Sequence, residues 1–114
     1  MKTWALRIRA EDRDVFSQIK SGKKKIETRA LGGRFNHVAK GDNLFFICGK
    51  GRLKKKVKKV QKFKSIKAML GKISYKKVWP HLANPSLKEV EKIYYNYSGY
   101  RERIKKYGLV AFWI

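Results

Sequence analysis

The chain has 114 residues, which suffices for one domain spanning 1–114 and leaves little room for a second. Thirty Lys and Arg oppose eight Asp and Glu, so the formal net charge is +22, yet three Trp, six Tyr and six Phe are too many aromatic residues for a disordered basic tail. One cysteine and two histidines exclude an internal disulfide and leave no credible ligand set for zinc, and no apolar stretch is long enough for a signal peptide or a membrane span.

The first third of the chain predicts a strand, a helix and a second strand. Residues 3–9 alternate and are rich in strand formers. Segment 11–20 begins with acidic residues and ends with a lysine, which suits a helix dipole, and Ser21-Gly22 supplies a stop. An apolar stripe runs along this helix at Val15, Phe16 and Ile19. Residues 24–29 form the next candidate strand, and 30–40 have the composition of a loop.

The middle of the chain predicts a hairpin with one very basic arm. A turn at 40–43 leads into the buried strand 44–48, and Gly49-Lys50-Gly51 makes the hairpin connection. Residues 52–60 are expected to form a single partner strand. Its even positions from 52 to 58 carry only Lys or Arg, and only two of its odd positions, Leu53 and Val57, are apolar, so a bulge or an edge position is required.

The last third predicts two helices and a closing strand. Residues 65–70 indicate a short helix ended by a glycine, whereas 72–85 show no clear pattern. A capping box at Ser86 to Glu89 begins an amphipathic helix, and 100–106 suggest at most one more turn. The apolar run 107–114 is expected to be a buried strand. Five to six strands with two or three helices indicate an α+β domain, most plausibly a small β-barrel.

Five motifs in this order resemble the ASCH domain, a branch of the PUA-like superfamily. Residues Gly22 to Arg29 are similar to the G-x-K-x-x-E-x-R signature, and Lys40-Gly41-Asp42 to the GD turn of that family. Segment 63–70, the helix after Ser86 and the final Tyr107-Gly108-Leu109-Val110-Ala111 match the remaining motifs. The resemblance implies a PUA-like β-barrel with a cleft beside the signature strand and RNA as the partner.

The resemblance also implies possible activities. Some members of the family cleave RNA, and one small bacterial branch hydrolyses the amide of N4-acetylcytidine. In that branch the signature lysine, which corresponds to Lys24 here, is catalytic. A threonine occupies the position of Glu27. A catalytic glutamate lies just before the late helix, where this chain has His81-Leu82-Ala83-Asn84-Pro85. Two of the three catalytic positions of that branch therefore differ here.

Lys24, Glu27 and Arg29 form the best candidate constellation. Glu27 and Arg29 lie two apart in the expected strand and share one face, and a turn after Gly22 could bring Lys24 to the same side. A carboxylate between two cations stays ionised and could accept a hydrogen bond from an exocyclic amino group of a base. It could also act as a general base, with Lys24 or Arg29 stabilising the transition state. The competing interpretation is a structural ion pair that holds the strand to a neighbour.

Two further sets complete the candidate interface. The basic run from Lys50 to Lys64 suits a phosphate backbone, with a charged, aggregation-resistant edge as the alternative. Tyrosines near the cations of 92–106 suit base stacking; the helical spacing of Tyr94 and Tyr97 assigns those two to the core, and Trp79 is a candidate cleft wall. The residues expected to bind nucleic acid are Lys23, Arg34, Lys50, Arg52, Lys54, Lys56, Lys58, Trp79, Tyr95, Tyr100, Arg101 and Arg103.

The leading interpretation is an RNA-binding protein with a basic cleft beside the signature strand. The alternatives are a metal-independent ribonuclease or an N4-acetylcytidine-type amidohydrolase that uses Lys24 and Glu27, a module for single-stranded or double-stranded DNA, and a ribosome-associated structural protein. The composition predicts a cytoplasmic monomer that needs no metal or cofactor.

Overall fold

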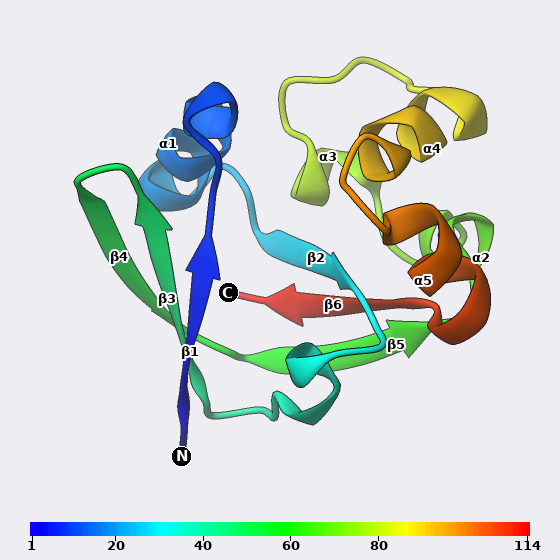
Figure 1. Cartoon of the computed structure of the whole chain (residues 1–114). Coiled ribbons are helices and arrows are strands. Elements are labelled where there is room, and N and C mark those ends of the chain that lie inside the picture. The colour runs from blue at the N-terminus through cyan, green and yellow to red at the C-terminus, as the bar shows by residue number, and fades with distance from the viewer.

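Two three-stranded sheets and a layer of helices make up the computed structural model, which describes residues 1–114 (Figure 1). The first sheet has the order β1 (Thr3–Arg7), β3 (Asn43–Cys48), β4 (Gly51–Lys56), and the second has the order β2 (Ile26–Ala30), β6 (Leu109–Trp113), β5 (Lys59–Phe63). β1 runs parallel to β3, and the other pairs are antiparallel. The predicted α+β class and strand number are confirmed, but no ladder joins the two sheets, so the barrel is not closed.

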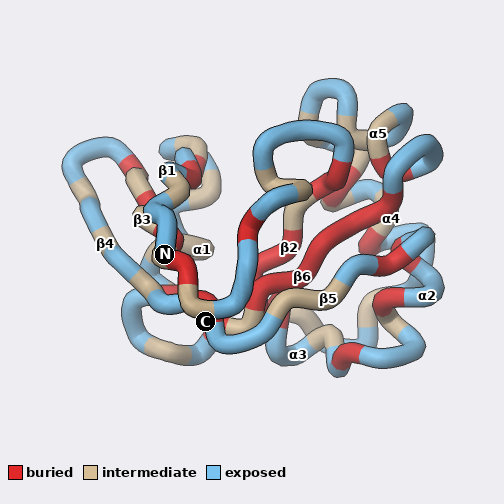
Figure 2. Tube along the Cα trace, turned by 90° about the horizontal axis from the view of Figure 1, so that it is seen from below, coloured by how far each residue is buried: buried red, intermediate tan, exposed pale blue.

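β6 is the central strand of the second sheet and packs on both of its faces. Val110 and Phe112 pack against Leu6 and Phe46 of the first sheet, whereas alternate residues of β6, such as Leu109, pack against the helices. Figure 2 shows this strand buried along nearly its whole length, while the residues of β4 alternate between exposed and half-buried. A strand covered on both faces needs apolar residues at consecutive positions, which explains the unbroken apolar run at the C-terminus.

Gly108, which precedes β6, is required by close packing. It has a φ of 88°, and a Cβ atom there would lie 2.1 Å from the Phe63 carbonyl oxygen at the end of β5. No other residue fits without moving that strand. The glycine of the closing motif therefore has a steric basis.

Five helices are present, rather than the two or three expected. They are α1 (Arg13–Ser21), α2 (Ile66–Leu70), α3 (Tyr75–Val78), α4 (Leu87–Tyr95) and α5 (Tyr100–Tyr107), with 3-10 turns η1 (Ala10–Asp12) and η2 (Arg34–His37). α1 lies beside the first sheet, and α2 to α5 gather on the other side of the molecule (Figure 1). None of the helices combines the length and the apolar character needed to cross a lipid bilayer.

The local signals for two helices are confirmed in detail. Ile19 of the predicted stripe is fully buried, and α1 ends at Gly22, which has a φ of 82°. At the start of α4, Ser86 Oγ accepts from the Glu89 amide at 3.2 Å, and Glu89 Oε1 accepts from the Ser86 amide at 3.1 Å. Both amides lack partners within the helix, so this capping box fixes where α4 begins.

The expectation of a single strand over 52–60 is wrong. The chain leaves the first sheet after Lys56 and enters the second at Lys59. At the crossing, the Val57 amide donates to the Asp42 carbonyl and the Lys58 amide donates to the Trp113 carbonyl. Both halves are edge strands, so their lysines can stay exposed without facing a core.

The segment 100–106 was expected to add one turn, but it belongs to the two-turn helix α5. Gly99, with a φ of 75°, separates α5 from α4, and Ile104 is buried. Arg103 donates from its guanidinium to the Ala30 and Leu31 carbonyls and so ties α5 to the end of β2. Long-range packing, not local periodicity, stabilises this short helix.

Asp42 closes the corner between the N-terminus and β3. Its carboxylate accepts hydrogen bonds from the Trp4 indole at 2.9 Å, the Lys2 amide at 3.0 Å and the Ala39 amide at 3.0 Å. These bonds to the charged form, that from Trp4 foremost, lower the pKa of Asp42 to about 2.

We predict that Asp42 makes stability sensitive to acid. Since its pKa is lowered on folding from 3.8 to about 2, its contribution is present above pH 3.8 and is lost as the pH falls through about 2. Asp42→Asn should therefore lower the melting temperature at neutral pH, and its difference from the wild type should shrink as acid protonates the wild-type carboxylate.

Thermal unfolding followed by circular dichroism across this pH range measures the effect. Asp14, which is exposed and makes no hydrogen bond or ion pair, offers the matched control Asp14→Asn. A difference between Asp42→Asn and the wild type that stays constant down to about pH 2 contradicts the assignment.

Candidate functional site

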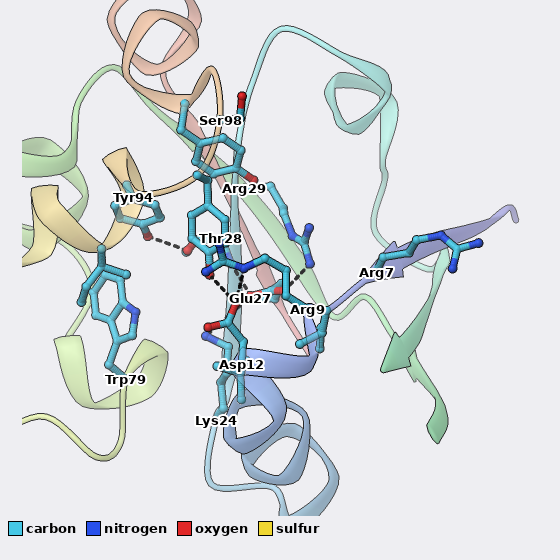
Figure 3. A pocket seen from close by; sticks show the side chains of 15 residues that line it. Arg7, Arg9, Asp12, Lys24, Glu27, Thr28, Arg29, Trp79, Tyr94 and Ser98 are labelled. Carbon is cyan, nitrogen blue, oxygen red and sulfur yellow. Dashed lines mark hydrogen bonds and ion pairs between the residues drawn. The ribbon is translucent and has the colours of Figure 1, made fainter. Parts of the chain in front are cut away.

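A cavity of about 290 Å³ opens where the two sheets fail to join (Figure 3). Its lining comes from the end of β1, from η1 and α1, from β2, and from α3 to α5. β1 and β2 each pair with a different neighbour and not with one another. The unclosed seam of the barrel therefore provides the space.

The floor of the cavity is an ion network centred on Glu27. Its Oε2 lies 3.0 Å from Arg29 NH2, and its Oε1 lies 3.6 Å from Lys24 Nζ and accepts from the Thr28 amide at 3.1 Å. The Glu27 side chain is only 8% exposed, that of Lys24 4% and that of Arg29 17%. The predicted grouping of these three residues is present, and the structural ion pair of the competing interpretation is present with it.

Two features of the backbone direct the three side chains to one place. Glu27 and Arg29 share a face of β2 because side chains alternate along a strand. Lys24 precedes the strand, which begins at Ile26 rather than at residue 24. Its amide donates to the Gln18 carbonyl and its Nζ donates to the Val78 carbonyl of α3 at 2.6 Å, so the turn places its ammonium beside Glu27.

Burial and mutual attraction act on these charges in opposite directions. Burial alone would raise the pKa of the Glu27 carboxyl, but the charges of Arg29 and Lys24, with hydrogen bonds from Arg29 and the Thr28 amide, bring it below its ordinary value. Burial lowers the pKa of Lys24, and the Glu27 charge only partly offsets this. Glu27 is therefore a carboxylate at neutral pH, suited to accepting hydrogen bonds.

Aromatic side chains form the walls. Tyr94 Oη lies 2.5 Å from Thr28 Oγ1, and its ring meets Trp79 edge to face with centroids 5.6 Å apart. Tyr97 and Tyr100 pack against each other at 5.2 Å. Tyr94 and Trp79 are buried, whereas Tyr97 and Tyr100 are half-buried and available to a ligand.

A second polar group lies at the mouth. Asp12 accepts from Arg9 Nε at 2.7 Å and from the Tyr97 hydroxyl at 3.3 Å, and the Arg9 guanidinium lies 4.4 Å from the centre of the Tyr97 ring. Next to the cavity lies a wider hollow of about 710 Å³, which has Trp79 in common with the cavity and extends to Tyr95. The cavity therefore opens into a broad surface depression.

The structure brings together some of the expected site residues and separates others. Lys24, Glu27, Arg29, Trp79 and Tyr100 line the cavity, and Tyr95 lines the adjoining hollow. Exposed cations away from the cavity are Lys23, Arg34, Lys50, Arg52, Lys54, Lys56, Lys58 and Arg101. Arg103 is half-buried, and its guanidinium is engaged with backbone carbonyls.

Several lining residues were not expected, namely Arg7, Arg9, Asp12 and Tyr97. The assignment of Tyr97 to the core is wrong, because α4 ends at Tyr95 and the helical spacing does not extend to residue 97. Asp12 was interpreted only as part of a helix dipole. No local signal could have paired it with Tyr97, which lies 85 residues away in the sequence.

The donor set of the site does not favour a metal ion. Nowhere do three His, Cys, Asp or Glu side chains gather closely enough to hold one. The Glu27 carboxylate is already neutralised by two cations. What the arrangement offers is an ionised acceptor, cationic donors and aromatic walls.

The open two-sheet barrel with the signature strand beside a cavity defines a PUA-like domain. The ASCH domain family matches residues 12–114, and the chain belongs to this family. Membership supports a nucleic-acid-binding role.

Two solved structures are similar to this chain. The crystal structure of hypothetical protein PH0355 is 34% identical, with a TM-score of 0.80 over 99% of this chain and 96% of that one. The solution structure of protein PF0455 from Pyrococcus furiosus is 32% identical, with a TM-score of 0.71 over 96% and 93%. No curated protein matches the chain.

We predict that Glu27→Gln lowers the free energy of unfolding by about 3 kcal/mol, because removing one member of a buried ion network leaves the others without a counter-charge. Urea denaturation measures the loss. The exposed Glu102, which makes no ion pair, provides the control Glu102→Gln, which should stay within about 0.5 kcal/mol of the wild type. Equal stabilities of the two variants would refute a buried network.

Proposed function

We propose that this protein binds RNA and that the cavity receives one base of the strand. The observation that carries the proposal is a buried carboxylate, held between two cations, on the floor of a cavity with aromatic walls. A cavity of about 290 Å³ is at the small end of the range for ligand pockets, and it suits one planar ring system rather than a length of strand.

The floor retains hydrogen-bonding capacity for such a base. An ionised carboxylate has about four acceptor positions, and Glu27 uses two of them on the Thr28 amide and the Arg29 guanidinium, with the Lys24 ammonium 3.6 Å away as an ion pair. A guanidinium carries five N–H donors, of which Arg29 gives one to Glu27. An exocyclic amino group can therefore donate to Glu27 while a base carbonyl or ring nitrogen accepts from Arg29.

The walls and the overall charge support the same proposal. Tyr97 and Tyr100 offer aromatic surface at the mouth, where a flipped base can stack. The net charge of +22 attracts a polyanion and strengthens binding through counterion release. The ribose 2′-hydroxyl of a bound RNA needs a hydrogen-bond partner, and the Asp12 carboxylate at the mouth of the cavity is positioned to accept from it.

The geometry favours binding over general base catalysis by Glu27. A carboxylate whose pKa is lowered is a poor base near neutral pH, and two cations already occupy it. The ribonuclease, amidohydrolase and DNA-binding alternatives stay predictions. Incubation with RNA and with acylated cytidines, using Lys24→Ala as the inactive control, tests the enzymatic ones.

We predict salt-sensitive binding with a base preference that depends on Glu27. Fluorescence anisotropy is measured with single-stranded RNAs that have the same length and different base compositions. The logarithm of the affinity should fall linearly with the logarithm of the salt concentration, with a slope of roughly 0.7 for each phosphate contacted. Glu27→Gln should narrow the difference between cytosine-rich and uracil-rich RNAs, because an amide can both donate and accept. Glu102→Gln should leave that difference unchanged.

A second variant keeps this test decisive if Glu27→Gln unfolds. Tyr97→Leu removes an aromatic ring from the mouth and leaves the floor intact, so it should weaken binding to all bases while preserving their order. Affinity that does not respond to salt, a base preference that is unchanged in a folded Glu27→Gln variant, or affinity that is unchanged in Tyr97→Leu would disprove the proposal.

A further inference from the structure

The outward face of the first sheet carries an ordered arrangement of side chains that the cavity does not use. The register of the three strands places its residues in rows across the sheet. From one end to the other, the rows are Thr3–Asn43–Lys56, Ala5–Phe45–Lys54 and Arg7–Ile47–Arg52. An aromatic ring thus lies in the middle row, between a small residue and a lysine.

Burial shows which way these side chains point. Along β3, Leu44, Phe46 and Cys48 are buried, whereas the alternate residues are half-buried. Along β1 and β4 the same alternation leaves Ala5 and Lys54 exposed. The helices α2 to α5 lie on the far side of the other sheet, so they do not cover this face (Figure 1). Phe45 is therefore accessible.

The charge of this face has one sign. Arg7, Arg52, Lys54 and Lys56 surround the apolar centre, and none of the nine residues in the three rows is acidic. Arg34 adds a further cation at the free edge of β1, where its guanidinium donates to the Ala5 carbonyl. An apolar centre bordered by cations, with no acidic residue in the three rows, complements a polyanion that has flat apolar groups.

We propose that the outward face of β1, β3 and β4 binds a single-stranded nucleic acid, with one base stacked on Phe45 and the phosphates on the surrounding cations. Aromatic platforms within positive grooves bind single strands because every base has a π-face. Ala5 beside the ring leaves space for a base to slide over it. A duplex does not fit this role, because its bases are already stacked inside the helix.

The face leads toward the cavity. Arg7 belongs to both, since it ends the third row and also lies on the cavity rim, with its side chain directed away from the Glu27 floor (Figure 3). A strand held on Phe45 can follow Arg7 to the mouth at Arg9 and Asp12. This inference rests on the proposed function and adds the path by which the strand approaches the cavity.

Anisotropy with a fluorescein-labelled oligouridine tests the stacking. Phe45→Ala and Phe45→Leu should each weaken binding by roughly 5- to 100-fold, whereas Phe45→Tyr should retain it. Phe45→Leu keeps an apolar side chain on the sheet, and so separates loss of the ring from loss of the fold. An abasic oligomer of equal length and charge should bind the wild type and Phe45→Leu alike.

The cations are tested by the salt dependence. Lys54→Ala should reduce the slope of log affinity against log salt by roughly 0.7, for base-bearing and abasic oligomers alike. Lys88→Ala, which removes an exposed lysine from α4, is the matched control and should leave the slope near that of the wild type. Folding of every variant is checked by its melting temperature.

The outcomes separate this inference from the proposed function. If the wild type binds RNA with a base preference that depends on Glu27, but Phe45→Leu and Lys54→Ala behave like Lys88→Ala, the sheet face is overturned and the cavity stands. If the Phe45 and Lys54 variants lose affinity while Glu27→Gln keeps the base preference, the face is supported and the cavity role fails. Failure of the wild type to bind any single strand overturns both, and tighter duplex binding that is insensitive to Phe45 overturns the face.

Discussion

The buried charge of Glu27 is the constraint around which the site is arranged. A carboxylate withdrawn from water must be neutralised, and Lys24 and Arg29 do so from the same short segment. Lys24 also donates to the carbonyl of Val78, so the network joins β2 to α3. Because all three side chains are largely buried, the floor of the cavity is preorganised rather than assembled when a ligand arrives.

Four of the eight acidic residues of the chain have specific structural roles. Glu27 lies on the cavity floor, Asp42 holds the corner before β3, Glu89 caps α4, and Asp12 bonds Arg9 and Tyr97. These carboxylates are therefore engaged in the fold and are not distributed to balance surface lysines. The resulting positive surface repels itself, and a bound polyanion relieves that repulsion.

The unclosed barrel separates two tasks that nucleic-acid binding requires. The seam between the sheets provides a small, polar-floored cavity that can discriminate among bases. The outward face of β1, β3 and β4 presents cations around Phe45, and the role proposed for it is to hold a strand without reading its sequence. Arg7 lies where the two meet, so under these two proposals affinity and selectivity come from neighbouring surfaces of one small domain.

The sequence by itself determined the parts of this structure that depend on neighbouring residues. Alternation predicted β1, a short apolar run predicted β3, and the capping box predicted the start of α4. The alternation of side chains along a strand placed Glu27 and Arg29 on one face. Such features are local. The alternation of side chains between the two faces of a strand, and the capping of the first amides of a helix, depend only on residues a few positions apart.

Only the tertiary structure decided where the chain changes sheets and what surrounds Glu27. The basic segment 52–60 is rich in lysine on both sides of Val57, and its division follows from the pairing of β4 with β3 and of β5 with the distant β6. Likewise, the Lys24 ammonium is held at the cavity because it donates a hydrogen bond to the Val78 carbonyl of α3, and Asp12 meets Tyr97 across 85 residues of sequence. These contacts depend on how separate elements pack together, and no local spacing encodes that packing.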